Sequence, residues 1–176
     1  MTKKQALFTS IWMVALLPVL IAWSMAYFGQ QLQLDTKNSG ELVDGELKVP
    51  ATLSAQLAGK WGLVVISEHC QHDCQQQVYR MQQLHKSLGQ NYDRLQPVWL
   101  TSQPAANDLD IDYTQVKTLS DPALLDWFNS HQLRWQDQSI WLIDPNGSLV
   151  MRFPPELTGK AMLGDIKWLF KVSRIG

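Results

Sequence analysis

WGLVVISEHCQHDC, residues 61–74, joins an apolar run to a polar segment that holds the only two cysteines of the chain. The run at residues 61–66 is nearly continuous and rich in β-branched side chains, which is typical of a strand buried on both faces of a sheet. Behind the second cysteine, apolar residues recur at helical spacing: Val78, Met81, Leu84 and Leu88. We therefore expect Cys70 and Cys74 to lie where a central strand ends and a helix begins.

Downstream of this stretch, the pattern predicts three more strands and two more helices. The strands are expected at residues 95–100, 140–143 and 149–153, the last two joined by a tight turn at residues 144–147. Pro97 indicates an edge position or a bulge for the first of these strands. Asp121 is a natural N-cap for one helix, and the other helix is expected to begin near Gly159.

Two segments between these elements carry weaker signals. Residues 53–59 are predicted as a short strand or a turn, and residues 101–121 are predicted to be irregular. The resulting order of elements is β-α-β-α-β-β-α, and a sheet with helices on its faces is the natural way to bury their apolar residues. We therefore expect an α/β domain of three layers around a central mixed sheet.

The N-terminal region contains a long apolar segment. Residues 7–28 include no Asp, Glu, Lys, Arg or His, and as a helix they cross the roughly 30 Å hydrocarbon core of a bilayer. Both a cleaved signal peptide and a retained transmembrane anchor have this character. The run exceeds the roughly 7–15 apolar residues of a signal peptide, and the residues after Phe28 form no small-x-small cleavage site. Both observations favour the retained anchor.

Lys3 and Lys4 precede the apolar segment, so the positive-inside rule predicts a cytoplasmic N-terminus. The expected order is a cytoplasmic segment, a transmembrane anchor, a linker and a folded domain, at residues 1–6, 7–28, 29–48 and 49–176. This is the order of a single-pass protein of the bacterial inner membrane with a periplasmic C-terminal domain. All 16 Asp and Glu lie beyond the anchor, as do all but two of the 15 Lys and Arg, and this acidic excess argues against nucleic acid as a partner.

The four-residue spacing of the cysteines favours a chemical role over a structural staple. A structural disulfide stabilises a protein most when it closes a long loop, whereas two cysteines close in sequence are typical of redox or metal sites. A helix N-terminus favours the thiolate, which is both the nucleophile and the metal ligand. Cys70 and Cys74 are therefore candidates for a redox-active disulfide and for binding a soft ion such as Cu(I). His69 and His72 are candidates for a third metal ligand or for a charge that holds a thiolate.

Residues 59–66, 69–74 and 137–147 together resemble the Sco/SenC family of copper chaperones and thiol–disulfide proteins. The resemblance implies an N-terminal membrane anchor and an exported thioredoxin-like domain. It implies that Cys70 and Cys74 are the Cys-x-x-x-Cys pair of the family. It also implies a role in the assembly of cytochrome c oxidase, with copper as the cofactor and an oxidase subunit or another assembly factor as the partner.

Two departures set this chain apart from the family pattern. The family usually has a proline after each cysteine, where this chain has Gln71 and Gln75. The third copper ligand of the family is a histidine just before the late strand, and residues 135–138 contain none. Gln136 or Gln138 stands in its place, and a glutamine amide is a poor ligand for Cu(I). The resemblance therefore carries over both cysteines but not a complete copper site.

These observations leave three functions as alternatives. The first is help in assembling a respiratory oxidase, by Cu(I) delivery or by keeping a copper-site cysteine pair reduced. The second is metal-free thiol–disulfide exchange, in which Cys70 attacks a partner disulfide and Cys74 resolves the mixed disulfide. The third is a non-catalytic interaction protein of the same assembly pathway.

Overall fold

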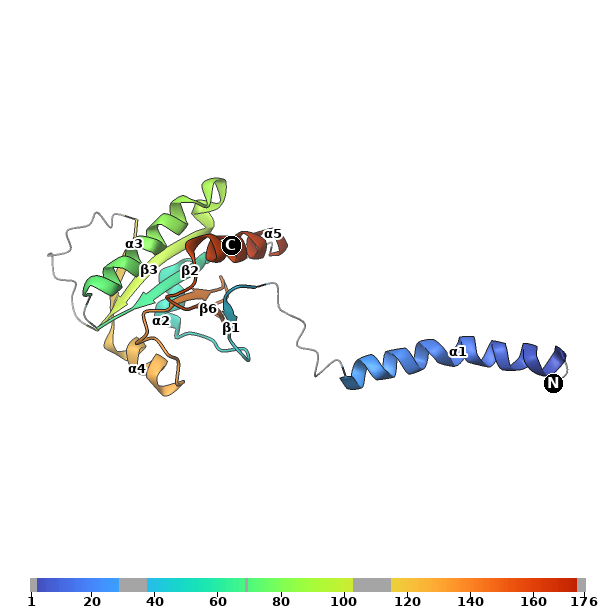
Figure 1. Cartoon of the computed structure of the whole chain (residues 1–176). Helices are drawn as coiled ribbons and strands as arrows, with labels where there is room; N and C mark the ends of the chain where they lie inside the picture. Colours follow the sequence, from blue (N-terminus) through green and yellow to red (C-terminus); the bar gives the residue numbers. More distant parts are fainter. Residues whose placement is uncertain (1–2, 29–37, 69, 103–114, 174–176) are drawn as a thin grey trace. The chain divides into compact units, whose positions relative to one another are not determined.

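The computed structural model describes residues 3–28, 38–68, 70–102 and 115–173, with side chains in the first range given for residues 12–24. The chain divides into two compact units, Met1–Lys37 and Asn38–Gly176. Among the described residues, the first unit consists of one helix, and the second is a sheet with helices on its faces (Figure 1). Both cysteines belong to the second unit.

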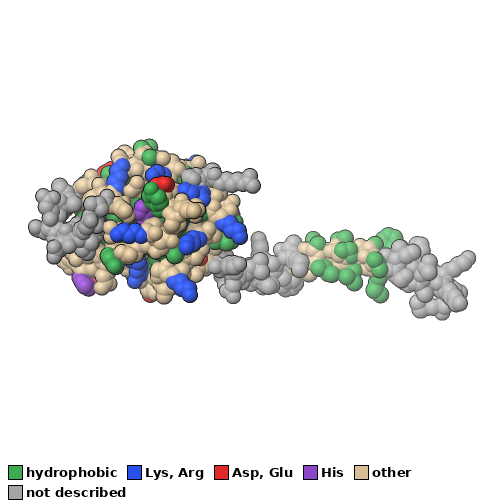
Figure 2. All heavy atoms as spheres, turned by 90° about the horizontal axis from the view of Figure 1, so that it is seen from above, with side chains coloured by type: hydrophobic (Ala, Val, Ile, Leu, Met, Phe, Trp, Pro, Cys, Tyr) green, Lys and Arg blue, Asp and Glu red, His purple; other side chains and the backbone are tan. Residues whose placement is uncertain are grey.

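Helix α1 extends over Lys3–Phe28. Its described side chains, at residues 12–24, are all exposed and mostly hydrophobic, as Figure 2 shows. Residues 7–11 and 25–28 of the expected anchor lie outside the set of described side chains. Within the described part of the chain, no helix combines the length and the apolar character needed to cross a membrane.

In the described part of the second unit, six strands form one mixed sheet in the order β1-β6-β5-β2-β3-β4. Their bounds are Glu41–Leu42 (β1), Trp61–Ile66 (β2), Leu95–Thr101 (β3), Lys117–Ser120 (β4), Ile140–Ile143 (β5) and Leu149–Phe153 (β6). β3 is parallel to both β2 and β4, whereas β5 is antiparallel to β2, and β6 is antiparallel to β5 and β1. The mixed sheet predicted from the sequence is confirmed.

Helices cover both faces of this sheet. Their bounds are Ala51–Leu57 (α2), His72–Lys86 (α3), Gly89–Arg94 (the 3₁₀ helix η1), Pro122–Ser130 (α4) and Gly159–Val172 (α5). α3 and α5 pack on one face, with Met81 and Ile166 in the core beneath them, and Figure 1 shows both on the same side of the sheet. α2 and α4 pack on the other face, with Leu57 and Phe128 in a second core. The expected three-layer α/β architecture is therefore present.

Four elements differ from the sequence prediction. β1 lies among residues expected to form a linker, and η1 lies where no element is expected. Residues expected to form a short strand or turn form α2 instead, which begins after Pro50 and buries Leu53 and Leu57, one helical turn apart, against the sheet. β4 lies inside the stretch expected to be irregular. Its four side chains are largely exposed, so it lacks the alternation of buried and exposed residues by which strands are recognised.

Pro97 is expected at an edge position or a bulge, but it lies in the interior strand β3, and the pairing of β2 with β3 has no bulge there. β2 pairs with β3 at Pro97, but the ladder between β3 and β4 begins only at Val98. Pro97 therefore has a paired strand on one side alone, which is a position that a residue without an N–H donor tolerates.

Candidate functional site

The two cysteines lie at the junction of β2 and α3, as the sequence predicts. All six residues of β2 are buried, so the strand runs through the centre of the domain and ends just before the cysteines. Gln71 is the extended N-cap of α3, and Cys74 is the third residue of the helix. The pair therefore lies at a helix N-terminus, where backbone N–H groups without a partner in the helix favour a thiolate.

Cys70 and Cys74 form a disulfide, with their Cα atoms 5.0 Å apart. The two sulfurs differ in access. Cys70 is half-buried, whereas Cys74 is 1% exposed and belongs to the core beneath α3. Cys70 is therefore the more accessible cysteine of the pair, and Cys74 is shielded.

A buried serine contacts the inner sulfur. Ser67 Oγ lies 3.1 Å from Cys74 Sγ, and the indole Nε1–H of Trp99 donates to Ser67 Oγ at 2.9 Å. Ser67 and Trp99 are 2% and 4% exposed. The backbone of Ser67 is also fixed, because its N–H donates to the carbonyl oxygen of Leu100 at 3.0 Å. Two hydrogen bonds thus hold the serine beside the Cys74 sulfur, one from Trp99 to the Ser67 hydroxyl and one from the Ser67 backbone N–H to Leu100.

The sequence analysis did not identify Ser67, although the two-residue alternation of side chains along β2 indicates which way Ser67 faces. Trp61, Leu63 and Val65 all belong to the core beneath α3 and α5, as expected for alternate residues of a strand. Ser67 continues this alternation one step beyond β2, so its side chain faces the helix that carries Cys74. The part played by Trp99 depends on the pairing of β3 with β2, which the sequence does not specify.

Of the two candidate histidine ligands, the structure describes one. His72 is exposed in the first turn of α3, and its Nε2 lies 3.1 Å from Nε2 of Gln76. His69 lies outside the described residues. Among the side chains that are described, no three His, Cys, Asp or Glu gather in a way that could hold a metal ion.

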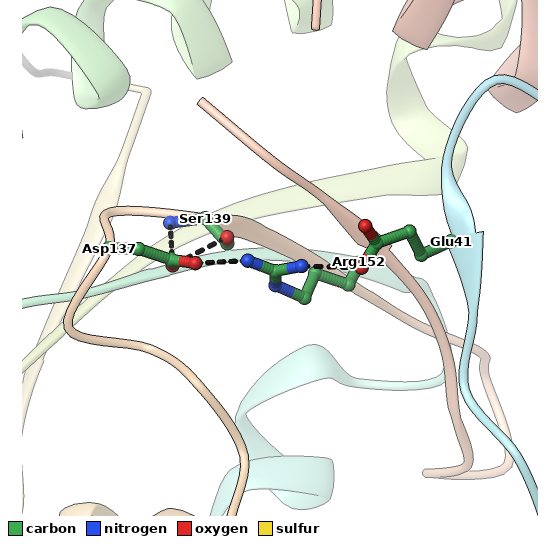
Figure 3. Close-up of polar contacts among 4 residues, drawn as sticks. All are labelled: Glu41, Asp137, Ser139 and Arg152. Carbon is green, nitrogen blue, oxygen red and sulfur yellow. Dashed lines mark hydrogen bonds and ion pairs between the residues drawn. The ribbon is translucent and has the colours of Figure 1, made fainter. Parts of the chain in front are cut away.

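A charged network holds the loop before β5. Asp137 Oδ1 accepts the backbone N–H and the hydroxyl of Ser139, at 3.1 and 2.6 Å. Figure 3 shows Arg152 of β6 lying between Asp137 and Glu41, and it pairs with both carboxylates. Burial acts to lower the pKa of Arg152, but its hydrogen bonds to Glu41 and Asp137 outweigh burial and raise that pKa above its ordinary value. The network therefore ties the loop to two strands through a permanently charged side chain.

This loop lies at the same end of the sheet as the cysteines, because Ile140 at its end pairs with Val65 near the end of β2. Its two glutamines differ in their contacts. Gln136 donates from Nε2 to Oδ1 of Asn129 on α4, at 3.3 Å. Gln138 has a φ of 63°, in the left-handed region, and its Oε1 is buried with no hydrogen-bond partner among the described residues. Of the two, Gln138 is therefore the one with a buried acceptor that lacks a partner among the described residues.

Comparison with known protein families identifies a family for most of the folded unit. Residues 61–173 match the family described as transmembrane-like, thioredoxin-like, C-terminal domain. The matched range begins at the first residue of β2 and ends just after α5, so it includes the cysteine pair and most of the sheet. No curated protein matches the chain significantly.

Several solved structures share the fold at low sequence identity. Apo Sco1 of Thermus thermophilus is 13% identical with a TM-score of 0.57, over 78% of this chain and 99% of that one. Copper-bound ScoI of Bradyrhizobium japonicum is 21% identical with a TM-score of 0.51, over 65% and 88%. A thiol:disulfide interchange protein of Bacteroides sp. is 13% identical with a TM-score of 0.50, over 79% and 95%. At these identities the comparisons establish a thioredoxin-like fold similar to that of the Sco proteins.

Proposed function

Since this chain belongs to the transmembrane-like, thioredoxin-like C-terminal domain family, we propose that it is a membrane-anchored, Sco-like protein that exchanges thiols and disulfides through Cys70 and Cys74. The observation that carries this proposal is the unequal burial of the two cysteines, of which Cys70 is half-buried and Cys74 is enclosed in the core. An accessible sulfur can attack or be attacked by a partner, and an enclosed one can resolve the mixed disulfide.

The proposed exchange balances electrons and bonds at each step. In the reduced protein, the Cys70 thiolate attacks one sulfur of a partner disulfide, and the other partner sulfur leaves as a thiolate. The Cys74 thiolate then attacks the Cys70 sulfur, which releases the second partner thiolate and forms the Cys70–Cys74 disulfide. Two electrons pass to the partner, and a thiol reductant returns the protein to its dithiol form.

We place this chemistry in the periplasm of a bacterium, with α1 in the inner membrane and the N-terminus in the cytoplasm. The absence of Asp, Glu, Lys, Arg and His from residues 7–28 supports this placement, and so do Lys3 and Lys4 before them. The proposed partner is a copper-site cysteine pair on a cytochrome oxidase subunit, or another assembly factor. The resemblance to Sco proteins supports that choice.

Redox titration of the full chain in detergent micelles tests the proposed exchange. After incubation in glutathione buffers, alkylation and mass spectrometry should find either two free thiols or none, and the chain should catalyse reduction of a disulfide-bonded peptide. The variant with both Cys70→Ser and Cys74→Ser is the control and should have no catalysis. Equal turnover by this variant would overturn the proposal. If the double Cys→Ser variant also fully complemented a strain that lacks this protein, the non-catalytic interaction role would be favoured.

Carriage of Cu(I) is a second candidate function, favoured by the soft donor set. Two thiolates at one helix end suit Cu(I), which would be cargo passed to a partner. A third ligand is less evident, because His72 is engaged with Gln76 and the loop before β5 carries glutamines. The residues present therefore fit a two-sulfur site for Cu(I).

Titration of the reduced chain with Cu(I), against a competing chelator, tests this candidate. We expect one Cu(I) per chain, with binding weakened by at least about 100-fold in the double Cys→Ser variant because both soft ligands are lost. The matched variant His72→Ala should change the affinity by less than about 3-fold, since its ring is engaged with Gln76. Equal, weak binding by the wild type and the double variant would remove the copper role.

A further inference from the structure

The hydrogen-bond direction at Cys74 is fixed by chemistry. A sulfur in a disulfide has no hydrogen, so Ser67 must be the donor in the 3.1 Å contact with Cys74 Sγ. The indole N–H of Trp99 can only donate, so Ser67 Oγ accepts from it at 2.9 Å. With one lone pair occupied by Trp99, the hydroxyl hydrogen is directed to the sulfur. Trp99, Ser67 and Cys74 thus form a one-way chain of hydrogen bonds.

We infer that Ser67 is a further catalytic residue of the thiol–disulfide exchange and that Trp99 is its positioning residue. When a thiolate attacks the Cys70 sulfur, the Cys70–Cys74 bond breaks and its electron pair stays on Cys74 Sγ. That sulfur is nearly unexposed, so water does not solvate the new charge. The Ser67 hydroxyl supplies a hydrogen bond at this atom, and hydrogen bonds to an ionised acceptor are roughly twice as strong as neutral ones.

This contact favours the reduced protein over the disulfide. A disulfide sulfur is a weak acceptor and a thiolate is a strong one, so the same O–H stabilises the product of reduction more than the reactant. The hydrogen bond from Ser67 therefore makes the disulfide more oxidising and makes the Cys74 thiolate a better leaving group. The inference deepens the proposed function and rests on it, because it assigns a step of that exchange to named groups.

Ser67→Ala in the full chain tests the inference. Removal of the hydroxyl should lower the equilibrium constant for reduction by glutathione about 3- to 10-fold, as expected for one charge-assisted hydrogen bond. Reduction by glutathione should slow by a similar factor, because the leaving Cys74 thiolate loses its donor. Ser139→Ala is the matched control, since Ser139 is also a buried serine at this end of the sheet but bonds to Asp137. Its equilibrium constant should match that of the wild type.

Trp99→Phe provides an independent readout that keeps Ser67 in place. It should shift the equilibrium in the same direction but less than Ser67→Ala, because the hydroxyl stays but is no longer oriented. The double variant should shift no further than Ser67→Ala alone, since Trp99 acts only through Ser67. An additive double variant, or an unchanged equilibrium in Ser67→Ala, would overturn the inference. Failure of the proposed function is a different outcome, because the wild type would then reduce the disulfide-bonded peptide no faster than the double Cys→Ser variant.

Discussion

Cys74→Ser is expected to trap the chain as a mixed disulfide through Cys70, whereas Cys70→Ser should leave a thiol that hardly reacts. Cys70 is half-buried, so a lone thiol there meets solvent and small disulfides. A lone thiol at Cys74 is 1% exposed and becomes accessible only through local opening of the structure. An opening free energy of about 3 kcal/mol slows its reaction on the order of 100-fold.

Alkylation rates of the two single variants measure this difference directly. Iodoacetamide should modify Cys74→Ser on the order of 100 times faster than Cys70→Ser in the native state. In strong urea the two rates should converge, because unfolding removes the difference in burial. Incubation with oxidised glutathione should yield the glutathione adduct of Cys74→Ser alone. If the native alkylation rates were equal, or faster for Cys70→Ser, the proposed roles of Cys70 as attacking thiol and Cys74 as resolving thiol would be contradicted.

The location of the site was predictable because a strong local pattern determines it. The continuous apolar run of β2 indicates a central strand, and the helical spacing after Cys74 indicates α3, so their junction follows from the sequence. Helix starts with a clear cap were also predictable. Asp121 accepts the N–H of Ala123 and caps α4 as expected, and α5 begins at Gly159.

Features that depend on tertiary pairing were not predictable in this way. β4 joins the sheet only through β3 and buries little of its own surface, so its sequence has no distinguishing period. The contact between Trp99 and Ser67 exists because β3 lies parallel to β2 with Trp99 beside Val65. Neither the register nor the neighbour of a buried strand is encoded in the periodicity of that strand alone.

The left-handed backbone at Gln138 is another feature set by context. Glutamine gives no local signal for a positive φ, a conformation that mainly glycine, asparagine and aspartate adopt. The loop is held instead by distant partners, since Arg152 of β6 pairs with Asp137 while Asp137 accepts from Ser139. The sequence shows a glutamine where the Sco/SenC pattern has a histidine, but only the fold shows how the loop is fixed.

Phe128→Ala is expected to lower the free energy of unfolding by about 3–5 kcal/mol, the usual cost of truncating a fully buried aromatic side chain. Phe128 is 0% exposed on α4, and its ring lies 5.9 Å from that of Trp141 in β5. Truncation leaves a cavity between the helix and the sheet. Urea unfolding of the full chain in micelles, followed by tryptophan fluorescence, measures the loss, and Tyr79→Ala at an exposed position of α3 should stay within about 0.5 kcal/mol.

The redox equilibrium of the cysteine pair separates this loss of stability from a loss of chemistry. Phe128 belongs to the core beneath α2 and α4, whereas Cys74 belongs to the core on the opposite face of the sheet. Under conditions where Phe128→Ala remains folded, its equilibrium constant with glutathione should therefore equal that of the wild type, because no group near either sulfur has changed. A shifted equilibrium would mean that the sheet transmits strain between its two faces. A stability loss below about 1 kcal/mol would contradict the close packing of α4 on the sheet, because a packed aromatic of this size costs several times more to remove.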